Sequence, residues 1–341
     1  MKITNPYVFI VGCPRSGTTL FRHMVNAHPQ IAITPEAHWI PRFFEERRGL
    51  TPEGVVTPDM IQQLLKHPKF ANFHIQPQDL LGLIVKERPT SYASLLTGIF
   101  DLYGQARGKA LVGNKTPDSV RKLRTLHMLW PETRFVHLIR DGRDVALSFM
   151  KWPKVLQKKP GNLSTWKDDP FSTAALWWEL NVRCGLRAFE WLDPKLCYEM
   201  RYESLIANPR KECAALCEFL KLPYDESMLR FHEGREESMS GDTMNPAWQP
   251  ITAGLRDWRT QTSEENVERF EAVAGELLDE LGYARAFPQP RAEVLEGASR
   301  IRNLIAQDLQ DLTLPKAPLQ AACHPVRSPG NTHDVRETIE R

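Results

Sequence analysis

The feature that most constrains the fold is the amino-terminal stretch YVFIVGCPRSGTTLF, residues 7–21. Its apolar run Tyr7–Val11 has the length of a buried strand, and a helical pattern begins at Thr18. The loop between them, Gly12–Thr19, contains two glycines spaced by four residues. A strand that turns through such a loop into a helix gathers backbone N–H groups at a helix amino terminus, where they bind an anion. An ordinary strand-to-helix turn is the structural alternative.

Further apolar runs alternate with helical patterns along the chain, at Ala110–Val112, Arg134–Ile139 and Leu196–Arg201. This alternation predicts an α/β fold, a P-loop-type parallel sheet flanked by helices. A helical insertion over about residues 38–106 is expected after the first strand-helix unit, where insertions usually build a substrate wall or lid. Its expected helices are His38–Arg48, Pro58–Lys66, Pro77–Lys86 and Tyr92–Gln105.

The second half of the chain is also mainly helical. Helical spacing predicts helices at Asp141–Met150 and Phe171–Trp191, and Ser263–Leu281 combines an apolar face with start and stop signals. We expect one domain over residues 1–285 and a C-terminal helix over residues 286–312, with its amphipathic part at Arg291–Leu312. Residues 313–341 contain Pro, Ser and Thr and are expected to form a mobile tail.

Composition excludes several classes of protein. The 341 residues are 42% hydrophobic, enough for a large globular core, and the net charge of +2 argues against a general nucleic-acid binder. We find no run of eighteen uncharged apolar residues, so no transmembrane segment is expected and a cytoplasmic location is predicted. The six cysteines are scattered without paired CxxC elements, so no metal site is expected.

The glycine loop lacks the lysine of a nucleotide-triphosphate site. In P-loop NTPases that lysine reaches the β and γ phosphates, and the next Ser or Thr holds Mg²⁺. Thr18 stands at the lysine position here, while Arg15 lies three residues earlier in the loop. A fork of donors suits a terminal 5′-phosphate group, and it suits a metal-bridged triphosphate poorly. The strand Arg134–Ile139 also ends in Arg140, where a Walker-B strand would end in Asp.

Arg140 belongs to a second possible anion site. It lies at the carboxyl end of a predicted strand, where open α/β sheets bind ligands, and Ser148 follows two helical turns later. The alternative for Arg140 is an ion pair with Asp141 or Asp144, a structural role that we assign rather to Arg143. Two anion sites at neighbouring strand ends imply a ligand phosphorylated at two places.

The motifs CPRSGTTLF and FVHLIRDGRDVALSFM together strongly resemble those of sulfotransferases that use 3′-phosphoadenosine-5′-phosphosulfate (PAPS) and release adenosine 3′,5′-bisphosphate (PAP). The resemblance extends from about Tyr7 to Tyr283, with gaps over the insertion. It implies that Arg140 and Ser148 bind the 3′-phosphate. It also implies a set of loop residues for the phosphosulfate: Arg15, Ser16, Gly17, Thr18 and Thr19.

Other stretches look similar to the branch containing tyrosylprotein sulfotransferases and bacterial relatives. By this resemblance Glu36 is the catalytic base, Lys115 of the Asn-Lys motif contacts the transferring group, and Tyr202 touches the nucleotide. Members of this branch use a lysine near the final Trp of the resemblance. Arg256 lies beside the corresponding position, and we assign Arg256 to nucleotide binding. His38 stands where the secreted members have an arginine, and their cysteines beside the Glu and Asn-Lys motifs are not found in this sequence. A membrane anchor like theirs is not expected.

The expected reaction is in-line transfer of the sulfuryl group to a hydroxyl or amine, which requires no metal in principle. Arg15 and Lys115 would stabilise charge on the bridging oxygen, each by ~2–4 kcal/mol, while Glu36 takes the acceptor proton. The alternative for Glu36 is a charge at the amino terminus of the next helix. The competing candidates for the base are His23, His28 and His38.

Two other functions fit the loop, namely an adenosine-bisphosphate-binding protein without transfer chemistry and an NTP-dependent kinase-like protein. For a sulfotransferase the sequence favours a small-molecule or glycan acceptor over a peptide, an expectation based only on the predicted cytoplasmic location. The oligomeric state is left open.

Overall fold

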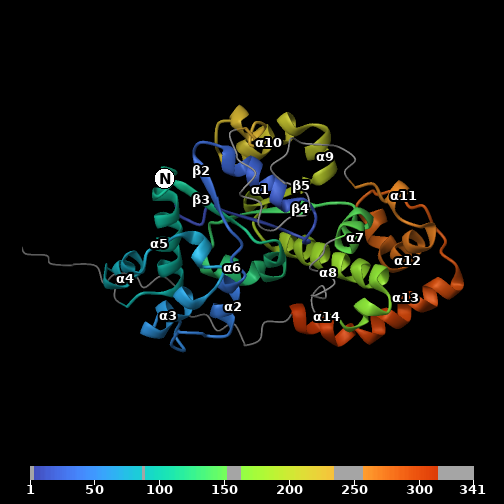
Figure 1. The fold of residues 1–341 in the computed structure, drawn as a ribbon, viewed down its shortest axis with the longest axis horizontal. Coiled ribbons are helices and arrows are strands. Elements are labelled where there is room, and N and C mark those ends of the chain that lie inside the picture. The colour runs from blue at the N-terminus through green and yellow to red at the C-terminus, as the bar shows by residue number, and fades with distance from the viewer. Residues whose placement is uncertain (1–3, 87–88, 152–162, 234–255, 314–341) are drawn as a thin grey trace, which may run out of the picture.

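The computed structural model describes residues 4–86, 89–151, 163–233 and 256–313. Its centre is a five-stranded sheet in the order β2-β3-β1-β4-β5, in which every neighbouring pair is parallel. The strands are β1 (Val8–Gly12), β2 (Ile31–Thr34), β3 (Leu111–Lys115), β4 (Arg134–Ile139) and β5 (Cys197–Arg201). Helices cover both faces, which buries a parallel sheet in the usual way (Figure 1). The predicted α/β class is confirmed.

One strand was not predicted. β2 lies between α1 (Thr18–Ala27) and the helical insertion and pairs with β3 at the edge of the sheet. Its four residues, IAIT, are too few to show a clear alternation of apolar and polar positions. The insertion therefore follows β2 instead of following α1 directly.

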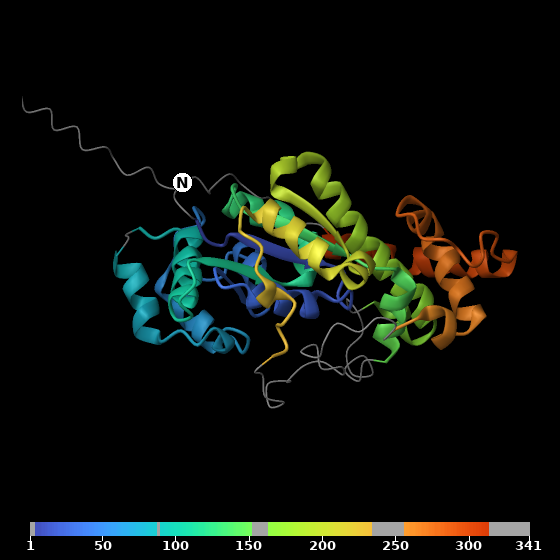
Figure 2. The same cartoon turned by 90° about the horizontal axis from the view of Figure 1, so that it is seen from above.

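The insertion contains α2 (Trp39–Glu45), α3 (Pro58–Lys66), α4 (Pro77–Lys86) and α5 (Tyr92–Gln105). A short 3-10 helix, η1 (Ala71–Phe73), lies between α3 and α4. These helices form one end of the elongated molecule (Figure 2). An aromatic cluster joins them to the sheet, because their apolar side chains share one core with residues of β1, β3 and β4.

The rest of the sheet is covered by helices from the second half of the chain. The helices α1 and α10 pack over one face and share a core with the strands beneath them. The bounds of the helices between β3 and β5 are η2 (Pro117–Lys122), α6 (Leu123–Leu129), α7 (Gly142–Met150), η5 (Ser164–Lys167), α8 (Pro170–Trp191) and η6 (Pro194–Leu196). The helices after β5 are α9 (Tyr202–Ala207), α10 (Pro209–Leu220) and η7 (Glu226–Met228).

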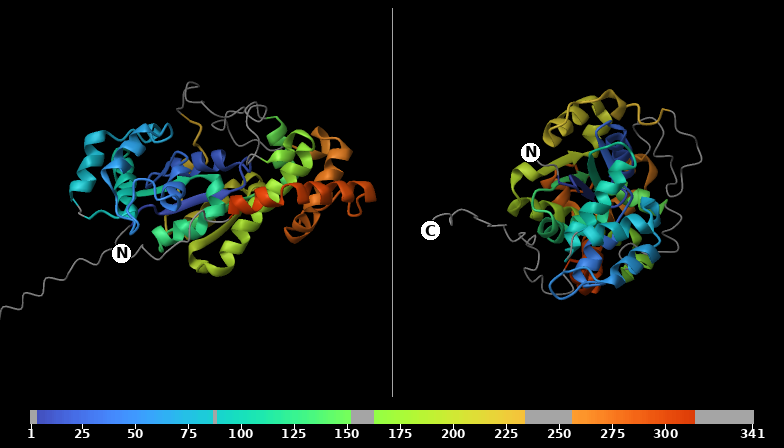
Figure 3. Two further views of the ribbon diagram at one scale, coloured as in Figure 1. Left: turned by 90° about the horizontal axis from the view of Figure 1, so that it is seen from below. Right: turned by 90° about the vertical axis from the view of Figure 1, so that its left-hand side faces the viewer.

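The C-terminal helices lie toward the end of the molecule opposite the insertion, and the last of them runs back toward the middle. They are α11 (Trp258–Gln261), α12 (Glu264–Glu280), α13 (Ala292–Leu304) and α14 (Ala306–Thr313). Figure 3 shows α13 and α14 running beside α8, with which they share an apolar core. The single helix expected over Arg291–Leu312 is two helices, because the chain leaves helical geometry at Ile305. The predicted tail from residue 314 onward lies outside the described residues.

The described ranges lack two features. No helix in them is long and apolar enough to cross a membrane, and no group of three His, Cys, Asp or Glu side chains is arranged to hold a metal ion. The predicted cytoplasmic location and the expected absence of a metal stay predictions.

Candidate active site

All five strands deliver a candidate residue to the same edge of the sheet. The glycine loop follows β1, Glu36 follows β2, Lys115 ends β3, Arg140 follows β4 and Tyr202 follows β5. Because the strands are parallel, their carboxyl ends meet at one edge, the place where open α/β sheets bind ligands. The fold thus brings together residues that are up to about 190 positions apart in the sequence.

The glycine loop is built closely against Tyr202. Gly17 has φ 91° at the amino terminus of α1, and an added Cβ there would lie 2.3 Å from Cε2 of Tyr202. Arg15 also has a positive φ, 76°, which is strained for a residue with a side chain. The buried Ser16 Oγ makes no hydrogen bond within the described residues. A strained loop with an unsatisfied hydroxyl fits an anion-binding role.

Three guanidinium groups converge beside this loop. Arg15 donates a hydrogen bond from Nε to Ser148 Oγ, at 3.2 Å, so the first motif contacts the second directly. Burial lowers the pKa of Arg15, and the charges of Arg256 and Arg140 lower it further. Like charges brought close together in a partly buried site are costly unless an anion is placed among them. The arrangement favours a ligand with more than one negative charge.

Arg140 forms the ion pair that was the alternative considered from the sequence, and its role in an anion site stays a prediction. Its guanidinium lies over the ring of Tyr202, with Cζ 4.3 Å from the centroid, and it forms an ion pair with Asp144 at 3.3 Å. Its buried Nε has no hydrogen-bond partner within the described residues. Arg143, by contrast, is enclosed by Asp141 at 2.7 Å and Glu271 at 2.6 Å, as the structural role requires.

The segment carrying Arg256 is fixed by Trp258. The backbone N–H of Trp258 donates to Asp144 at 3.0 Å, and its indole N–H donates to Asp141 at 3.1 Å. The guanidinium of Arg143 lies over the same indole, 3.8 Å from its centroid. These contacts tie α11 to the first turn of α7, next to Arg140.

Glu36 lies among three basic side chains. Its Oε1 accepts a hydrogen bond from Lys115 Nζ at 2.6 Å, and its Oε2 contacts His38 Nε2 at 3.1 Å and Lys69 Nζ at 3.2 Å. Burial alone would raise the pKa of Glu36, but the hydrogen bond with His38 and the charge of Lys115 outweigh it and hold the pKa well below its usual range. Burial lowers the pKa of Lys115, and Glu36 offsets only part of that effect.

Lys69 is a site residue that the sequence did not indicate. It lies between α3 and η1, in the insertion, 33 positions from Glu36. No motif contains it, and an isolated lysine in a polar loop has no local pattern that marks it as part of a site.

The Asn-Lys motif fixes the backbone on both sides of Glu36. Asn114 donates to the carbonyl of Pro35 at 2.9 Å, and Thr116 Oγ1 accepts from the N–H of Ala37 at 2.8 Å. Thr116 also donates to Asn114 at 2.8 Å, so the two side chains act as one clamp. The position of Glu36 relative to Lys115 is therefore set by β3 itself.

The alternatives to Glu36 as base separate clearly. The oxygens of Glu36 are held by Lys115, His38 and Lys69, and no side chain makes a cap hydrogen bond at the start of α2. His28 is buried and structural, with its ring bound to the carbonyl of Pro223 at 2.8 Å. His38 contacts Glu36 directly, with Nε2 3.1 Å from Oε2.

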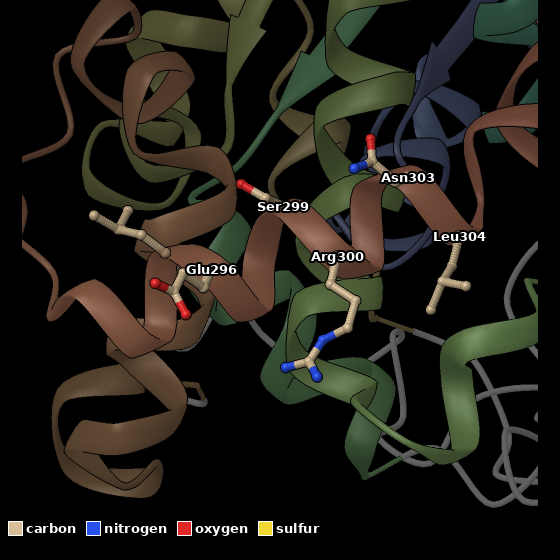
Figure 4. Close-up of a pocket in the computed structure, with 6 residues that line it drawn as sticks. Glu296, Ser299, Arg300, Asn303 and Leu304 are labelled. Atoms are coloured by element: carbon tan, nitrogen blue, oxygen red, sulfur yellow. The ribbon is translucent and has the colours of Figure 1, made fainter.

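A surface hollow of about 660 Å³ lies elsewhere, along the outer face of α13. Figure 4 shows the side chains that line it, from Glu296 to Leu304 (Figure 4). None of them is a predicted site residue.

Comparison with known proteins bears on the acceptor. The chain is 25% identical over 285 residues to protein-tyrosine sulfotransferase A of Caenorhabditis elegans, covering 82% of this chain and 68% of the relative. It is 23% identical over 319 residues to human protein-tyrosine sulfotransferase 1, covering 87% and 76%. The sulfotransferase domain of the Synechococcus PCC 7002 olefin synthase superposes with a TM-score of 0.54 at 25% identity, covering 77% of this chain and 90% of that domain.

These relatives overturn one expectation. The preference for a small-molecule or glycan acceptor over a peptide is wrong, since the curated relatives are named protein-tyrosine sulfotransferases. The preference was inferred from an expected cellular compartment, which carries no information about the chemistry of an acceptor.

The family model of the sulfotransferases matches residues 6–226, which contain the glycine loop, Glu36, Lys115, Arg140 and Tyr202. The match covers well over half of the chain. It supports the expected donor PAPS and the expected product PAP. The chain belongs to the sulfotransferase family.

Proposed function

We propose that the protein transfers the sulfuryl group of PAPS to the phenolic hydroxyl of tyrosine in a peptide or protein. The observation that carries this proposal is the ion pair of Glu36 and Lys115, 2.6 Å apart, at the strand edge where three arginines converge. The pair offers a proton acceptor and a cation beside a site suited to a polyanion. The tyrosine acceptor is supported by the names of the relatives.

The donor fits the residues present. The amides of the glycine loop, with Arg15, Thr18 and Thr19, would hold the 5′-phosphosulfate at the amino terminus of α1. Arg140, Ser148 and Arg256 would hold the 3′-phosphate. Two unsatisfied groups support this fit, the buried Ser16 Oγ and Arg140 Nε, because such polar groups usually have a partner.

The chemistry needs one proton acceptor and one stabiliser of the leaving group. The acceptor oxygen forms a bond to sulfur while the bond from sulfur to the bridging phosphate oxygen breaks, which releases PAP. The phenolic proton passes to the Glu36 carboxylate, and Lys115 and Arg15 stabilise the charge that develops on the bridging oxygen.

Lys115 has two possible anionic partners in this scheme. In the structure it holds Glu36, which keeps that carboxylate ionised and makes it a weak base. A sulfuryl group beside Lys115 competes for the same ammonium. When Lys115 turns toward the donor, the pKa of Glu36 rises and the carboxylate becomes a stronger base.

The test combines label transfer with binding. With ³⁵S-labelled PAPS and EDTA present, we expect label on a peptide containing tyrosine and none on the same peptide with phenylalanine. Glu36→Gln is expected to lower turnover by about 10²–10⁴-fold, the range for loss of a general base, while PAP still binds in calorimetry. Binding of PAP without any label transfer would instead identify a nucleotide-binding protein, and a requirement for ATP and Mg²⁺ would identify a kinase.

A further inference from the structure

The two oxygens of Glu36 have different surroundings. Within the described residues Oε1 accepts a hydrogen bond from Lys115, while Oε2 contacts both Lys69 and His38. We propose that Lys69 and His38 anchor Oε2, so that Oε1 is the oxygen that receives the acceptor proton. Lys69 is thereby a positioning residue that the insertion supplies to the reaction. This inference rests on the proposed function.

The turn that carries Lys69 is well anchored. The backbone N–H of Lys69 donates to His67 Nδ1 at 3.3 Å, and the next residue, Phe70, is buried. Phe70 meets Trp39 edge to face, with centroids 5.7 Å apart, and the ring of His67 lies 6.3 Å from Trp39. Trp39 begins α2, only three residues after Glu36. The aromatic cluster thus fixes Lys69 relative to the base.

His38 is held between two carboxylates. Its Nε2 contacts Glu36 at 3.1 Å, and its Nδ1 lies 3.6 Å from Asp118. Asp118 is in turn paired with Arg121 at 3.2 Å, in η2 directly after β3. Oε2 is therefore tied to two separate elements, the insertion through Lys69 and η2 through His38.

The cations differ in what they are free to do during the reaction. Lys115 is buried and ends a strand beside the donor site, whereas the side chain of Lys69 is 43% exposed. When Lys115 moves to the sulfuryl group, Oε1 loses its cation while Oε2 keeps both anchors. The carboxylate then presents Oε1 to the acceptor without rotating. A base held in one orientation saves the cost of ordering it in the transition state.

The test removes the charge of Lys69 and compares this variant with one in which another lysine of the insertion is replaced in the same way. Lys69→Met is expected to lower kcat about tenfold at pH values where Glu36 is ionised, and to leave the Kd for PAP unchanged. Lys66→Met is the matched control, since Lys66 is exposed at the end of α3, and it is expected to have wild-type kcat. Lys69→Arg, which keeps a cation, is expected to restore most of the activity.

The pH profile separates positioning from a general effect on folding. Charged and titratable groups from several elements act on Glu36: Lys115 from β3, Lys69 and His38 from the insertion, Arg22 from α1 and Arg15 from the loop. Removal of the Lys69 charge is expected to move the acid limb of the kcat profile to higher pH, because a carboxylate with fewer cations is protonated more easily. A purely structural loss would lower the profile without moving it.

Two results would overturn different claims. If Lys69→Met has the kcat and pH profile of Lys66→Met, Lys69 does not position the base and the inference is wrong. If the wild-type protein fails to bind PAP or to transfer label, the proposed function itself fails. A Lys69→Met protein that loses PAP affinity as well as kcat also contradicts the inference, since Lys69 would then act on the donor site.

Discussion

The hydroxyl of Thr116 sets the position of the base. It accepts a hydrogen bond from the N–H of Ala37 and donates one to Asn114. The backbone around Glu36 therefore depends on the hydroxyl of the buried Thr116. Replacement by a side chain of the same shape without a hydroxyl leaves the Ala37 N–H unsatisfied, which costs about 1–3 kcal/mol. Thr116 is thus expected to matter for turnover although it touches no substrate.

We predict that Thr116→Val lowers kcat by at least about tenfold while PAP binding in calorimetry is unchanged, because the clamp acts on Glu36 and not on the nucleotide. Thr116→Ser keeps the hydroxyl and serves as the control, with nearly wild-type kcat expected. Equal activity of the Val and Ser variants would show that the strand alone positions Glu36.

Gly17 is required for two separate reasons. Its φ of 91° disfavours any side chain, and an added Cβ would collide with the ring of Tyr202. Gly282 also has a positive φ, 77°, but an added Cβ there meets nothing within 4 Å. Alanine would therefore strain the backbone at both positions, but only at Gly17 would it also collide with a neighbouring side chain.

We predict that Gly17→Ala and Gly282→Ala each lower the free energy of unfolding by about 1–3 kcal/mol, the cost of a strained backbone. Gly17→Ala alone is expected to weaken PAP binding, at least about tenfold, because Tyr202 must move away from the loop. Urea unfolding and calorimetry measure the two effects. Equal PAP affinity of both variants would mean that the contact of loop and ring does not shape the nucleotide site.

At the scale of elements, the sequence predicted what depends on local pattern. The helices α3, α4 and α5 have the predicted bounds, and α8 differs by one residue, because each has a long apolar stripe and a clear start. β2 was missed because it is short. The break at Ile305 was missed because the apolar pattern continues through it on the same side.

The site divides in the same way. Four site residues each belong to a short continuous stretch of sequence that resembles a motif of a known family, namely Arg15, Glu36, Lys115 and Arg140. Such motifs can be identified from the sequence alone. Lys69 reaches Glu36 only because the insertion folds back on β2, and the clamp of Asn114 on Pro35 depends on the pairing of β2 with β3. Contacts between distant segments follow from topology, which local periodicity does not encode.

The contact of α11 with α7 gives a prediction at this scale. Trp258 donates its indole N–H to Asp141 and lies two residues after Arg256, so loss of this anchor is expected to displace Arg256. We predict that Trp258→Phe weakens PAP binding several-fold and leaves binding of adenosine 5′-monophosphate nearly unchanged, since Arg256 is assigned to the 3′-phosphate. Trp130→Phe is the matched control, because that indole donates to Thr97 in the insertion, at 3.0 Å. Equal losses for both nucleotides would contradict the assignment of Arg256.

At the scale of the whole molecule, charge and core are separated. The net charge is only +2, yet cations gather at the edge of the sheet where the strands end. The face of the sheet under α1 and α10 is apolar. Anion binding by this protein is therefore a local property, and ionic strength is expected to act on PAP binding more than on folding.

A buried polar side chain lies on the opposite face of the sheet, against α8. His137, on β4, is fully buried, and neither ring nitrogen has a hydrogen-bond partner within the described residues. Gly185 of α8 makes room for it, since an added Cβ there would lie 2.3 Å from the imidazole. Burial, with a smaller effect of the charge of Arg201, lowers the pKa of His137 to about 3. The ring is therefore neutral in the folded protein across the physiological range.

This buried histidine predicts how global stability depends on pH. Above about pH 6.5 the imidazole is neutral in the folded and unfolded states, so it gives no pH dependence. As the pH falls below 6.5, the unfolded chain binds a proton that the folded chain excludes, and the free energy of unfolding falls by about 1.4 kcal/mol per unit until near pH 3. At pH 5 the expected loss from this group is about 2 kcal/mol.

We predict that His137→Leu removes this part of the pH dependence, because leucine binds no proton in either state. Urea unfolding at pH 8, 6.5, 5.5 and 5 measures it as the difference between wild type and variant at each pH. The exposed His74, replaced by Asn, is the control and is expected to leave the pH dependence unchanged. If wild type and His137→Leu lose the same free energy between pH 6.5 and 5, the imidazole is protonated inside the folded protein, and its burial does not exclude the charge.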